Sequence, residues 1–154
     1  MRKIALSRGE YALVSDQDYE RVSAHKWSLS HSPSHSDKMY AVTKIGGKQT
    51  GMHRFIMQTK AGLFVDHADG NGLNNTRENL RECTRGQNRA NSVSSRALPK
   101  GVYSRNQRSG AVVFRARIRV NGKTISLGTF SNQHEASKAY AKAAKLVHKE
   151  FARP

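Results

Sequence analysis

Residues 65–81, VDHADGNGLNNTRENLR, run from an apolar strand-like start straight into Asp66-His67 and then into a segment with four asparagines. Asparagine and glycine suit tight loops, because they tolerate turn backbone conformations and bond to nearby backbone groups. A loop does not require a histidine beside a carboxylate at its start. The pair Asp66-His67 therefore indicates chemistry, whereas we interpret Asn71, Asn74 and Asn75 as turn residues and Asp69 as a loop residue.

The surrounding pattern predicts a strand, a long loop, a second strand and a helix. Residues 65–67 read as the end of the first strand and residues 79–81 as the returning strand. Thr84 and Gln87 are spaced as in a capping box, so a helix carrying Asn88 is expected to follow. Such a unit can bring Asp66, His67 and Asn88 together.

These three residue types suit hydrolysis assisted by a metal ion. Asp66 and Asn88 offer oxygen ligands, which favour Mg²⁺ over zinc. A neutral imidazole at His67 can deprotonate a water molecule. The expected ion is Mg²⁺ or Mn²⁺, one per active site, and it would offset negative charge on a phosphate.

The charge of the chain indicates a polyanionic partner. The 154 residues include 27 Lys and Arg against 11 acidic residues, a net charge of +16. Residues 1–98 hold 15 basic and 9 acidic residues, net +6, whereas residues 99–154 hold 12 and 2, net +10. A serine-rich stretch without periodicity joins the halves. We therefore expect domains at 1–91 and 99–154 with a linker at 92–98.

The lack of a recognisable targeting signal and the single cysteine indicate where in the cell the protein is expected to act. The sequence has no apolar run long enough to span a bilayer, and the segment after Met1-Arg2-Lys3 is too short for a signal-peptide core. The single cysteine, Cys83, cannot form an internal disulfide and is expected to be a small buried residue. A cytoplasmic protein with no membrane partner is the prediction.

The first half also shows short strands and turns. Strands are expected at 3–6 and 11–14, followed by a helix from a Ser15 cap to about His25, with Trp27 in the core. Residues 30–37 are interpreted as a mobile insertion with solvated histidines. A hairpin is expected at 39–44 and 49–53, around Gly46-Gly47.

The second half alternates as a half-buried strand does. From Phe114 to Val120 the apolar residues face one way, and Arg115, Arg117 and Arg119 face the other. Asn121-Gly122 predicts a hairpin, with a return strand at 123–130 and a first strand at 101–105. The helix after Asn132 is expected to cover the apolar face. Its covering residues have helical spacing: Ala136, Tyr140, Ala143, Val147 and Phe151.

The first half resembles the HNH endonucleases of the phage and intron-homing branch. The motifs are MHRFIM at 52–57, VDH at 65–67, NNTRENL at 74–80 and TRGQN at 84–88, after a leader at 3–27. The resemblance implies a ββα-metal (His-Me finger) fold with a core motif at 52–91. It implies that His67 is the general base, that Asn79 braces the loop that orients it, and that Asp66 and Asn88 hold the ion. It gives His53 and Arg54 supporting or phosphate-facing roles.

The second half resembles the ethylene-response-factor, or plant apetala, type of DNA-binding domain. The matching segments are KGVYSR at 100–105, VVFRARIRVNGKTISLGTF at 112–130 and EASKAYAKAAKLVHKEFA at 135–152. Phe114 stands where that family often has tryptophan. The resemblance implies a three-stranded sheet that contacts double-stranded DNA. Its expected DNA-binding residues are Arg105, Arg108, Arg115, Arg117, Arg119 and Lys123.

Together these patterns predict an α+β chain, with a ββα-metal nuclease module followed by a three-stranded antiparallel sheet packed on one helix. The predicted function is a metal-dependent, strand-nicking, phage-encoded DNA endonuclease that works as a monomer without an obligate protein partner. One alternative is a DNA-binding regulatory protein with an inactive nuclease module. Another is a basic RNA-binding protein, which the lack of expected exposed aromatics on the arginine face disfavours.

Overall fold

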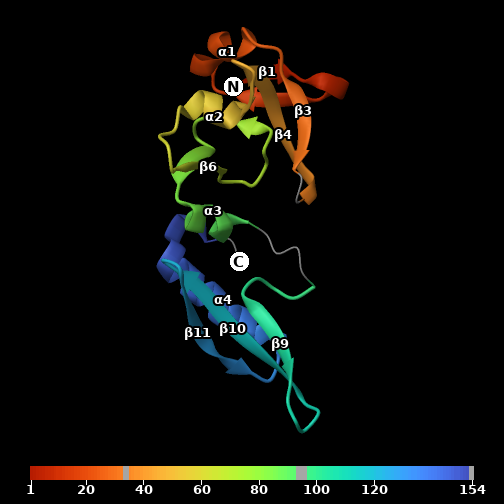
Figure 1. The fold of residues 1–154 in the computed structure, drawn as a ribbon, viewed down its shortest axis with the longest axis vertical. Helices are drawn as coiled ribbons and strands as arrows, with labels where there is room; N and C mark the ends of the chain where they lie inside the picture. The colour runs from red at the N-terminus through yellow and green to blue at the C-terminus, as the bar shows by residue number, and fades with distance from the viewer. Residues whose placement is uncertain (33–34, 93–96, 153–154) are drawn as a thin grey trace. The chain divides into compact units, whose positions relative to one another are not determined.

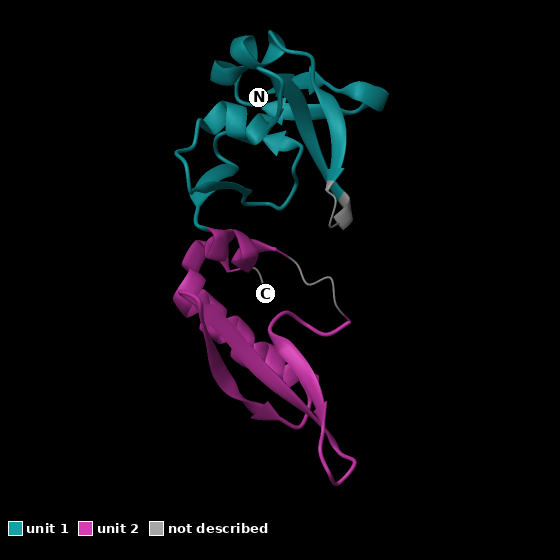
Figure 2. Ribbon diagram, in the orientation of Figure 1, with its two compact units in different colours: residues 1–84 teal, residues 85–154 magenta. Residues whose placement is uncertain are grey.

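The computed structural model describes residues 1–32, 35–92 and 97–152 of a mixed α/β chain with several small sheets (Figure 1). The chain divides into two compact units, residues 1–84 and 85–154, which are described separately below (Figure 2). The expected domain boundaries stay a prediction, and residues 93–96 of the expected linker lie outside the described part. Within the described residues, no helix combines the length and apolar character needed to cross a membrane.

The first unit contains eight strands and two α-helices in its described part. The strands are β1 (Arg2–Ala5), β2 (Tyr11–Val14), β3 (Ser28–Ser32), β4 (His35–Ile45), β5 (Lys48–Gly51), β6 (Phe64–His67), β7 (Asn74–Asn75) and β8 (Leu80–Cys83). The helices are α1 (Asp16–Ser23) and α2 (Met52–Met57), with a 3₁₀ turn η1 (Ser7–Gly9). They form three sheets, β1-β2-β7, β3-β4-β5 and β6-β8.

The predicted helix after Ser15 is present, but Ser15 does not cap it through its side chain. Helix α1 starts at Asp16, and the Ser15 hydroxyl instead accepts a hydrogen bond from the backbone N–H of Arg77 at 2.9 Å. The predicted capping contact of Ser15 was therefore wrong. The Ser15 hydroxyl oxygen bonds to a backbone N–H 62 residues away in the chain instead of to one in the first turn of α1.

Residues 30–37 were expected to be a mobile insertion, whereas the described residues of this segment lie in strands β3 and β4. Strand β3 pairs antiparallel with β4, from Ser28 opposite Val42 to Ser32 opposite His35. Residues 33 and 34 lie outside the described part. Pairing with a long neighbouring strand overrides the turn-like composition of this segment.

The hairpin around Gly46-Gly47 is confirmed, since Ile45 pairs with Lys48 and both glycines have positive φ angles of 55° and 76°. The predicted second strand ends earlier than expected. It stops at Gly51, and Met52 and His53 begin helix α2 instead. Met52 and Ile56, four residues apart, are buried on one face of this helix.

The core of the first unit gathers around α1, α2 and the strands beside them. Val22, Trp27, Met52 and Ile56 are at most 4% exposed. The Trp27 indole donates a hydrogen bond to the Val22 carbonyl at 2.8 Å, and its ring meets Phe55 edge-on at 5.7 Å. Each such large side chain contributes about 1.5–3 kcal/mol of burial free energy. The core position predicted for Trp27 is confirmed.

Strands β6 and β8 form the ribbon predicted around the loop. Phe64 pairs with Cys83, and His67 pairs with Leu80. Cys83 is 2% exposed, and burial raises the pKa of its thiol to about 11, as befits a structural rather than a reactive cysteine. The ribbon thus carries Asp66 and His67 at the end where the loop begins.

The second unit contains helix α3 (Arg85–Asn91), strands β9 (Val102–Asn106), β10 (Val112–Val120) and β11 (Lys123–Phe130), helix α4 (Gln133–His148) and a 3₁₀ turn η2 (Lys149–Phe151). The strands form an antiparallel sheet with β10 in the centre. Asn121 and Gly122 both have positive φ angles, 48° and 82°, as a two-residue hairpin turn requires. The Asn132 side chain accepts a bond from the Glu135 N–H at 2.9 Å and so caps α4.

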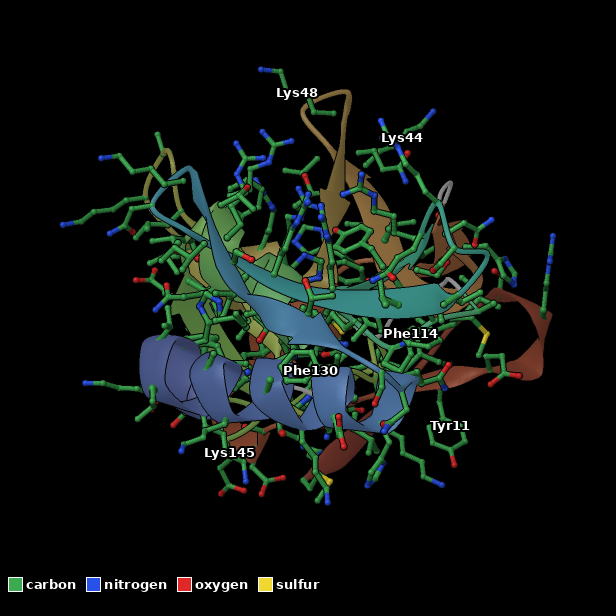
Figure 3. All side chains as sticks on the ribbon, turned by 90° about the horizontal axis from the view of Figure 1, so that it is seen from below. Tyr11, Lys44, Lys48, Phe114, Phe130 and Lys145 are labelled. Carbon is green, nitrogen blue, oxygen red and sulfur yellow. The ribbon has the colours of Figure 1, made fainter. Side chains whose placement is uncertain are left out.

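Helix α4 packs on one face of this sheet. Ala116, Ile118, Ala136, Tyr140 and Ala144 are buried between them. Figure 3 shows Phe114 and Phe130 on the side of the sheet that faces α4, and Lys145 on the outer side of the helix. Two predicted covering residues differ from expectation. Val147 is 40% exposed, and Phe151 is buried from η2 after the helix has ended, because the backbone leaves the helical path at Lys149.

Candidate active site

The loop between β6 and β8 is organised by the side chain of Asp69. Its carboxylate accepts hydrogen bonds from the Asn71 backbone N–H at 2.8 Å, the Asn74 amide at 2.8 Å and the Asn79 amide at 2.9 Å. Burial by itself would raise the pKa of Asp69, but these bonds outweigh it and the net pKa is lowered. Asp69 therefore stays ionised and acts as the hub of the loop.

Asn79 is bonded to this loop at both ends of its amide. Its nitrogen donates to Asp69 Oδ1 and to the Asn74 carbonyl at 2.7 Å, and its oxygen accepts from the Asp69 backbone N–H at 3.0 Å. These contacts hold the loop against the start of β8. They are compatible with the predicted bracing role, which remains a prediction.

His67 is 6% exposed and sits among three other side chains. Its Nε2 lies 3.3 Å from Asn75 Oδ1, and its ring lies 5.2 Å from the His53 ring and 6.0 Å from the Tyr40 ring, centroid to centroid. Burial lowers the pKa of His67, although the Asn75 contact and the charges of Asp69 and Asp66 oppose that shift. The imidazole is thus neutral at pH 7, which a general base requires.

Asn75 is a residue whose contact sequence reasoning missed. We interpreted it as a turn residue, yet its side chain is fully buried and bonded to His67. The sequence does offer one signal, the Asn74-Asn75 pair. Two adjacent asparagines can have different roles, and here the Asn74 amide bonds to Asp69 whereas the Asn75 amide bonds to His67. Only the parallel pairing of β7 with β2 shows which of the two amides turns inward.

His53 lies beside His67 on α2, whereas its neighbour Arg54 is exposed. Burial is the main cause that lowers the pKa of His53 to about 3, with smaller effects from His67 and Arg54. Its Nδ1 has no hydrogen-bond partner. The Gly51 position permits this placement, because a Cβ there would lie 2.7 Å from His53 Cε1. His53 is therefore a neutral wall of the site, and Arg54 is the exposed member of the pair.

Asp66 is 6% exposed and forms an ion pair with Arg81, its register partner on β8. The Arg81 Nε and Nη2 atoms donate to Asp66 Oδ2 at 2.9 and 2.8 Å. The antiparallel register of β6 and β8 places the Arg81 guanidinium opposite the Asp66 carboxylate.

Asn88 lies half-buried in α3, which belongs to the second unit. Its predicted partnership with Asp66 at one metal ion therefore stays a prediction.

The donor chemistry beside His67 fits a hard divalent cation. Asp66 supplies carboxylate oxygens, and Mg²⁺ is commonly bound through one or two carboxylates together with substrate phosphates and water. Across the residues that are described, no three His, Cys, Asp and Glu side chains gather into a metal-binding group. The remaining ligands would then be amide, phosphate or water oxygens.

Comparison with known proteins agrees with this architecture. Residues 51–90 match the HNH endonuclease family. Over 153 residues the chain is 32% identical to an uncharacterized HNH endonuclease of Acanthamoeba polyphaga mimivirus, covering 96% of this chain and 75% of the relative. The chain belongs to the HNH endonuclease family. No solved structure matches it.

Membership of the HNH endonuclease family indicates a nuclease with DNA as its substrate. The matched residues span α2, β6, the Asp69 loop, β8 and most of α3. They include every candidate residue of the site: His53, Arg54, Asp66, His67, Asn75, Asn79 and Asn88. The family match ends before the sheet of the second unit.

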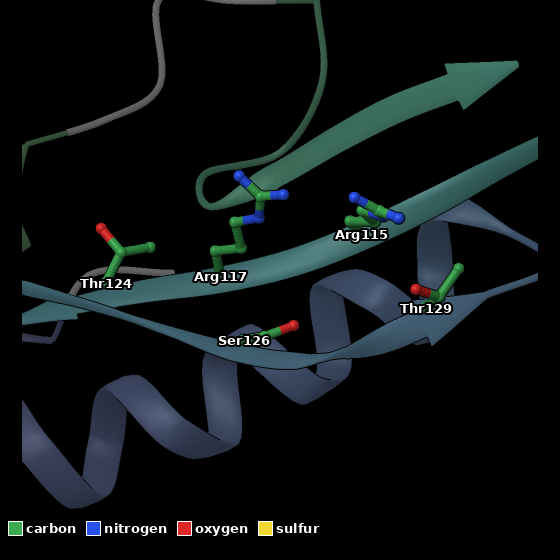
Figure 4. A pocket seen from close by; sticks show the side chains of 5 residues that line it. All are labelled: Arg115, Arg117, Thr124, Ser126 and Thr129. Atoms are coloured by element: carbon green, nitrogen blue, oxygen red, sulfur yellow. The ribbon is translucent and has the colours of Figure 1, made fainter.

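A second polar surface lies on the sheet face opposite α4. An open groove of about 450 Å³ is lined by Arg115, Arg117, Thr124, Ser126 and Thr129 (Figure 4). Cross-strand pairing places these residues together, since Arg115 lies opposite Thr129 and Arg117 opposite Ser126. The groove therefore combines two guanidinium groups with three hydroxyl groups.

The other expected DNA-binding residues are distributed around this groove. Arg105 pairs with Val113 and so shares the face of Arg115, while Arg108 is exposed in the turn between β9 and β10. Arg119 donates to the Gly122 carbonyl at 3.2 Å. Lys123 pairs with Val120, whose side chain packs toward α4, so the register places Lys123 on the opposite face from the arginines.

The arginine face also carries an exposed aromatic residue that we did not expect. Tyr103 is 44% exposed and pairs with Arg115, and the Arg117 guanidinium carbon lies 5.9 Å from its ring centroid. The argument against an RNA partner that relied on the absence of exposed aromatics was therefore wrong.

Proposed function

We propose that this HNH endonuclease family member is a divalent-metal-dependent DNA endonuclease that nicks one strand, with His67 as its general base. The observation that carries the proposal is the environment of His67. The ring is buried and neutral, and it stands at the end of β6 next to a carboxylate. The loop that follows His67 is held by the hydrogen bonds of Asp69 and Asn79. A general base must be held in one position, and such a loop supports that role.

In this proposal His67 takes a proton from a water molecule as the water oxygen attacks phosphorus. The bond between phosphorus and one sugar oxygen then breaks, and that oxygen leaves with a proton from solvent. Asn79 keeps the loop in place through its three bonds to Asp69 and Asn74. His53 and Tyr40 exclude water from one side of the His67 ring.

Asp66 and Asn88 would hold the divalent ion, Mg²⁺ or Mn²⁺. When bound, the ion supplies positive charge that offsets the charge developing on the phosphate and on the departing oxygen. Arg54, exposed at the surface of α2, is the proposed phosphate contact beside it.

We assign binding of double-stranded DNA to the second unit, as an ethylene-response-factor-type module. The support is the groove of Arg115 and Arg117 with its hydroxyl groups, within a segment of net charge +10. Arginine forks match guanine edges and phosphates, and a sheet can enter the major groove. Arg105 and Arg108 would extend the contact along the DNA backbone. Arg119 and Lys123 lie at the hairpin turn between β10 and β11.

The proposed biological setting is a virus-encoded enzyme of the homing type acting in the cytoplasm of a bacterial host. The support is the resemblance of the motifs at 52–91 to the phage and homing branch. The relative reported above, from Acanthamoeba polyphaga mimivirus, also comes from a virus, although from a virus of amoebae.

The decisive experiment incubates the purified chain with supercoiled plasmid, with Mg²⁺, with Mn²⁺ and with EDTA. We expect cleavage that EDTA abolishes. His67→Ala should lower the rate by about 10²–10⁴-fold while DNA binding persists. Arg117→Ala should show the opposite pattern, with weaker DNA binding and a shallower salt dependence.

Cleavage at the wild-type rate by His67→Ala would refute the assignment of the base, and activity in EDTA would refute the metal. A chain that binds DNA but never cuts it, with any divalent ion, would favour the regulatory-protein alternative. Competition with single-stranded RNA tests the remaining alternative, which the exposure of Tyr103 favours. Tighter binding to RNA than to duplex DNA would overturn the assigned partner.

A further inference from the structure

We infer that Asn75 is a positioning residue that holds His67 in the tautomer with its proton on Nε2, which leaves Nδ1 as the atom that accepts the proton from water. This inference deepens the proposed function and rests on it, because it specifies how the proposed general base is oriented. It assigns to Asn75 a role that differs from the loop-bracing role of Asn79.

The orientation of the Asn75 amide follows from its second partner. Its Nδ2 atom lies 3.3 Å from the Gly72 backbone carbonyl. A carbonyl oxygen only accepts hydrogen bonds, so the NH₂ end of the amide faces Gly72 and the oxygen faces His67. This leaves Asn75 Oδ1, an acceptor, at 3.3 Å from His67 Nε2. Two acceptors cannot bond to each other, so Nε2 carries the hydrogen.

The backbone around Asn75 prevents its amide from turning away. Asn75 belongs to β7, where it pairs with Val14 of β2 in a parallel ladder, and its side chain is fully buried. The preceding residues are anchored as well, since the Leu13 N–H donates to the Leu73 carbonyl at 2.8 Å. The backbone at and before Asn75 is therefore held in place. In this position the buried Asn75 amide has one orientation in which both its oxygen and its nitrogen are hydrogen-bonded.

Gly72, which supplies the orienting carbonyl, is held in place by close packing. A Cβ at this position would lie 2.3 Å from the Met39 carbonyl oxygen and 2.6 Å from the Tyr40 ring. The same Tyr40 ring packs 6.0 Å from the His67 ring. One tight contact therefore fixes both the carbonyl that orients Asn75 and an aromatic wall of His67.

Asn75 and Asn79 have different roles in the loop between β6 and β8. The hydrogen bonds of Asn79 go to Asp69 and to the Asn74 backbone, and so they fix the path of the chain. Asn75 reaches the imidazole itself.

The first test measures the tautomer directly by ¹⁵N NMR on the full-length protein, above the pH at which His67 titrates. We expect Nε2 to be protonated, Nδ1 to be unprotonated, and the Nε2–H proton to exchange slowly with solvent. A proton on Nδ1, or rapid exchange at Nε2, would overturn the inference. Neither result depends on activity, so the inference can fail while the proposed function stands.

The second test compares Asn75→Asp with Asn75→Leu. Both substitutions remove the bond to Gly72, but aspartate keeps an acceptor toward His67 and leucine does not. We expect Asn75→Asp to keep the Nε2–H tautomer and to shift the acid limb of the nicking profile upward by ~1 pH unit, because a carboxylate stabilises the imidazolium. We expect Asn75→Leu to show a mixture of tautomers and a rate lower by about tenfold or more.

The pH profile also depends on the other groups that face His67. These are Asp66 of β6, Asp69 of the loop, Lys38 and Tyr40 of β4, and His53 of α2. Glu78→Ala is the control, since it changes an exposed side chain close to Asn75 in the chain and leaves Asn75 unchanged. The His67 tautomer should not change in this variant.

Equal losses of activity in Asn75→Asp and Asn75→Leu, with the tautomer unchanged in both, would reduce Asn75 to a structural residue. If Asn75→Leu does not fold, the NMR measurements of the tautomer and of proton exchange in the wild-type protein still test the inference about Asn75. His67→Ala that cuts normally would refute the proposed function instead, whatever the tautomer of His67.

Discussion

At the scale of single residues, His53 shows how burial sets the charge of the site. Its Nδ1 is buried without a hydrogen-bond partner, and its pKa is lowered to about 3 chiefly by burial. The unfolded chain binds a proton at this residue near pH 6.5, whereas the folded chain does not. Stability from His53 is therefore complete above pH 6.5 and is lost as the pH falls toward 3.

We predict that His53→Phe reduces the acid sensitivity of folding. Removing this one titration should flatten the decline in stability below pH 6.5 by at most about 1.4 kcal/mol per pH unit. At pH 7 the variant should be as stable as the wild type or more so, because an apolar ring replaces an unsatisfied one. Urea unfolding at several pH values measures this. His25→Phe, at a histidine that packs against Trp27 and Phe55, is the control. An unchanged pH dependence in His53→Phe would contradict the lowered pKa.

Arg81 is the residue whose position most affects the proposed metal site. Its guanidinium faces the Asp66 carboxylate that we propose as a metal ligand, so two cations compete for one anion. We predict that Arg81→Gln lowers the melting temperature without metal, since a buried carboxylate loses its charged partner, at a cost of about 1–3 kcal/mol. Added Mg²⁺ should then raise the melting temperature more than it does in the wild type.

The measurement is a thermal melt of each protein with and without Mg²⁺, so it needs no cleavage. Lys60→Gln, an exposed change in the same unit, should behave as the wild type does. An equal response to Mg²⁺ in Arg81→Gln and the wild type would argue against Asp66 as a ligand.

At the scale of elements, a charged cluster connects α1 to the loop between β6 and β8. Asp18 of α1 is 2% exposed and accepts bonds from Arg77 Nε at 2.7 Å and Nη2 at 2.9 Å. Arg21 also donates to Asp18 at 2.9 Å and to the Ile56 carbonyl of α2 at 3.1 Å. The bonds from Arg77 are the main cause that lowers the pKa of Asp18. Helix α1 thus holds both the loop and α2.

We predict that Arg77→Ala destabilises the protein by about 1–3 kcal/mol, because it leaves buried Asp18 with only one arginine. Nicking should slow as well, since Arg77 lies two residues after Asn75. The contribution of Asp18 is present above its usual pKa of about 4 and is lost below it, so the penalty should shrink under strong acid. Chemical denaturation at pH 7 and at low pH measures it. Glu78→Ala, at the exposed neighbouring residue, should change neither quantity. A penalty independent of pH would show that the ion pair is not its cause.

At the scale of the whole molecule, one chain carries one Asp-His-Asn-Asn set at residues 66, 67, 79 and 88. One general base activates one water molecule, which attacks one phosphodiester at a time. Cutting both strands therefore requires a second copy or a repositioning step. The net charge of +16 opposes self-association without DNA. A single, asymmetric sheet in the second unit favours one orientation on a non-palindromic site.

We predict that supercoiled plasmid becomes open circle first, with linear product late or absent. A time course on agarose gels, with sedimentation of the protein alone and with DNA, measures the products and the number of copies. A mixture of wild type and His67→Ala serves as the control, because a monomer should show a rate proportional to the wild-type share. Linear DNA formed without an open-circle intermediate, by a dimer, would contradict the prediction.

Local patterns in the sequence were enough to predict much of this protein. The turns at Gly46-Gly47 and Asn121-Gly122, the β6–β8 ribbon and the buried face of β10 all follow from turn chemistry and alternation, which act over a few residues. The capped start of α4 follows in the same way. The HNH motifs identified the family because their spacing is linear in the chain.

Tertiary structure decided the contacts that span long stretches of sequence. Asp18 and Arg77 lie 59 positions apart, and Arg81 reaches Asp66 across 15. That Asn75 rather than Asn79 meets His67 depends on the parallel pairing of β7 with β2, to which no local pattern points. The strand at 28–32 and the helix at 52–57 likewise form because neighbours pair with or bury them. Sequence periodicity records which face of an element is apolar, but the partner of a polar side chain is set only when distant segments meet.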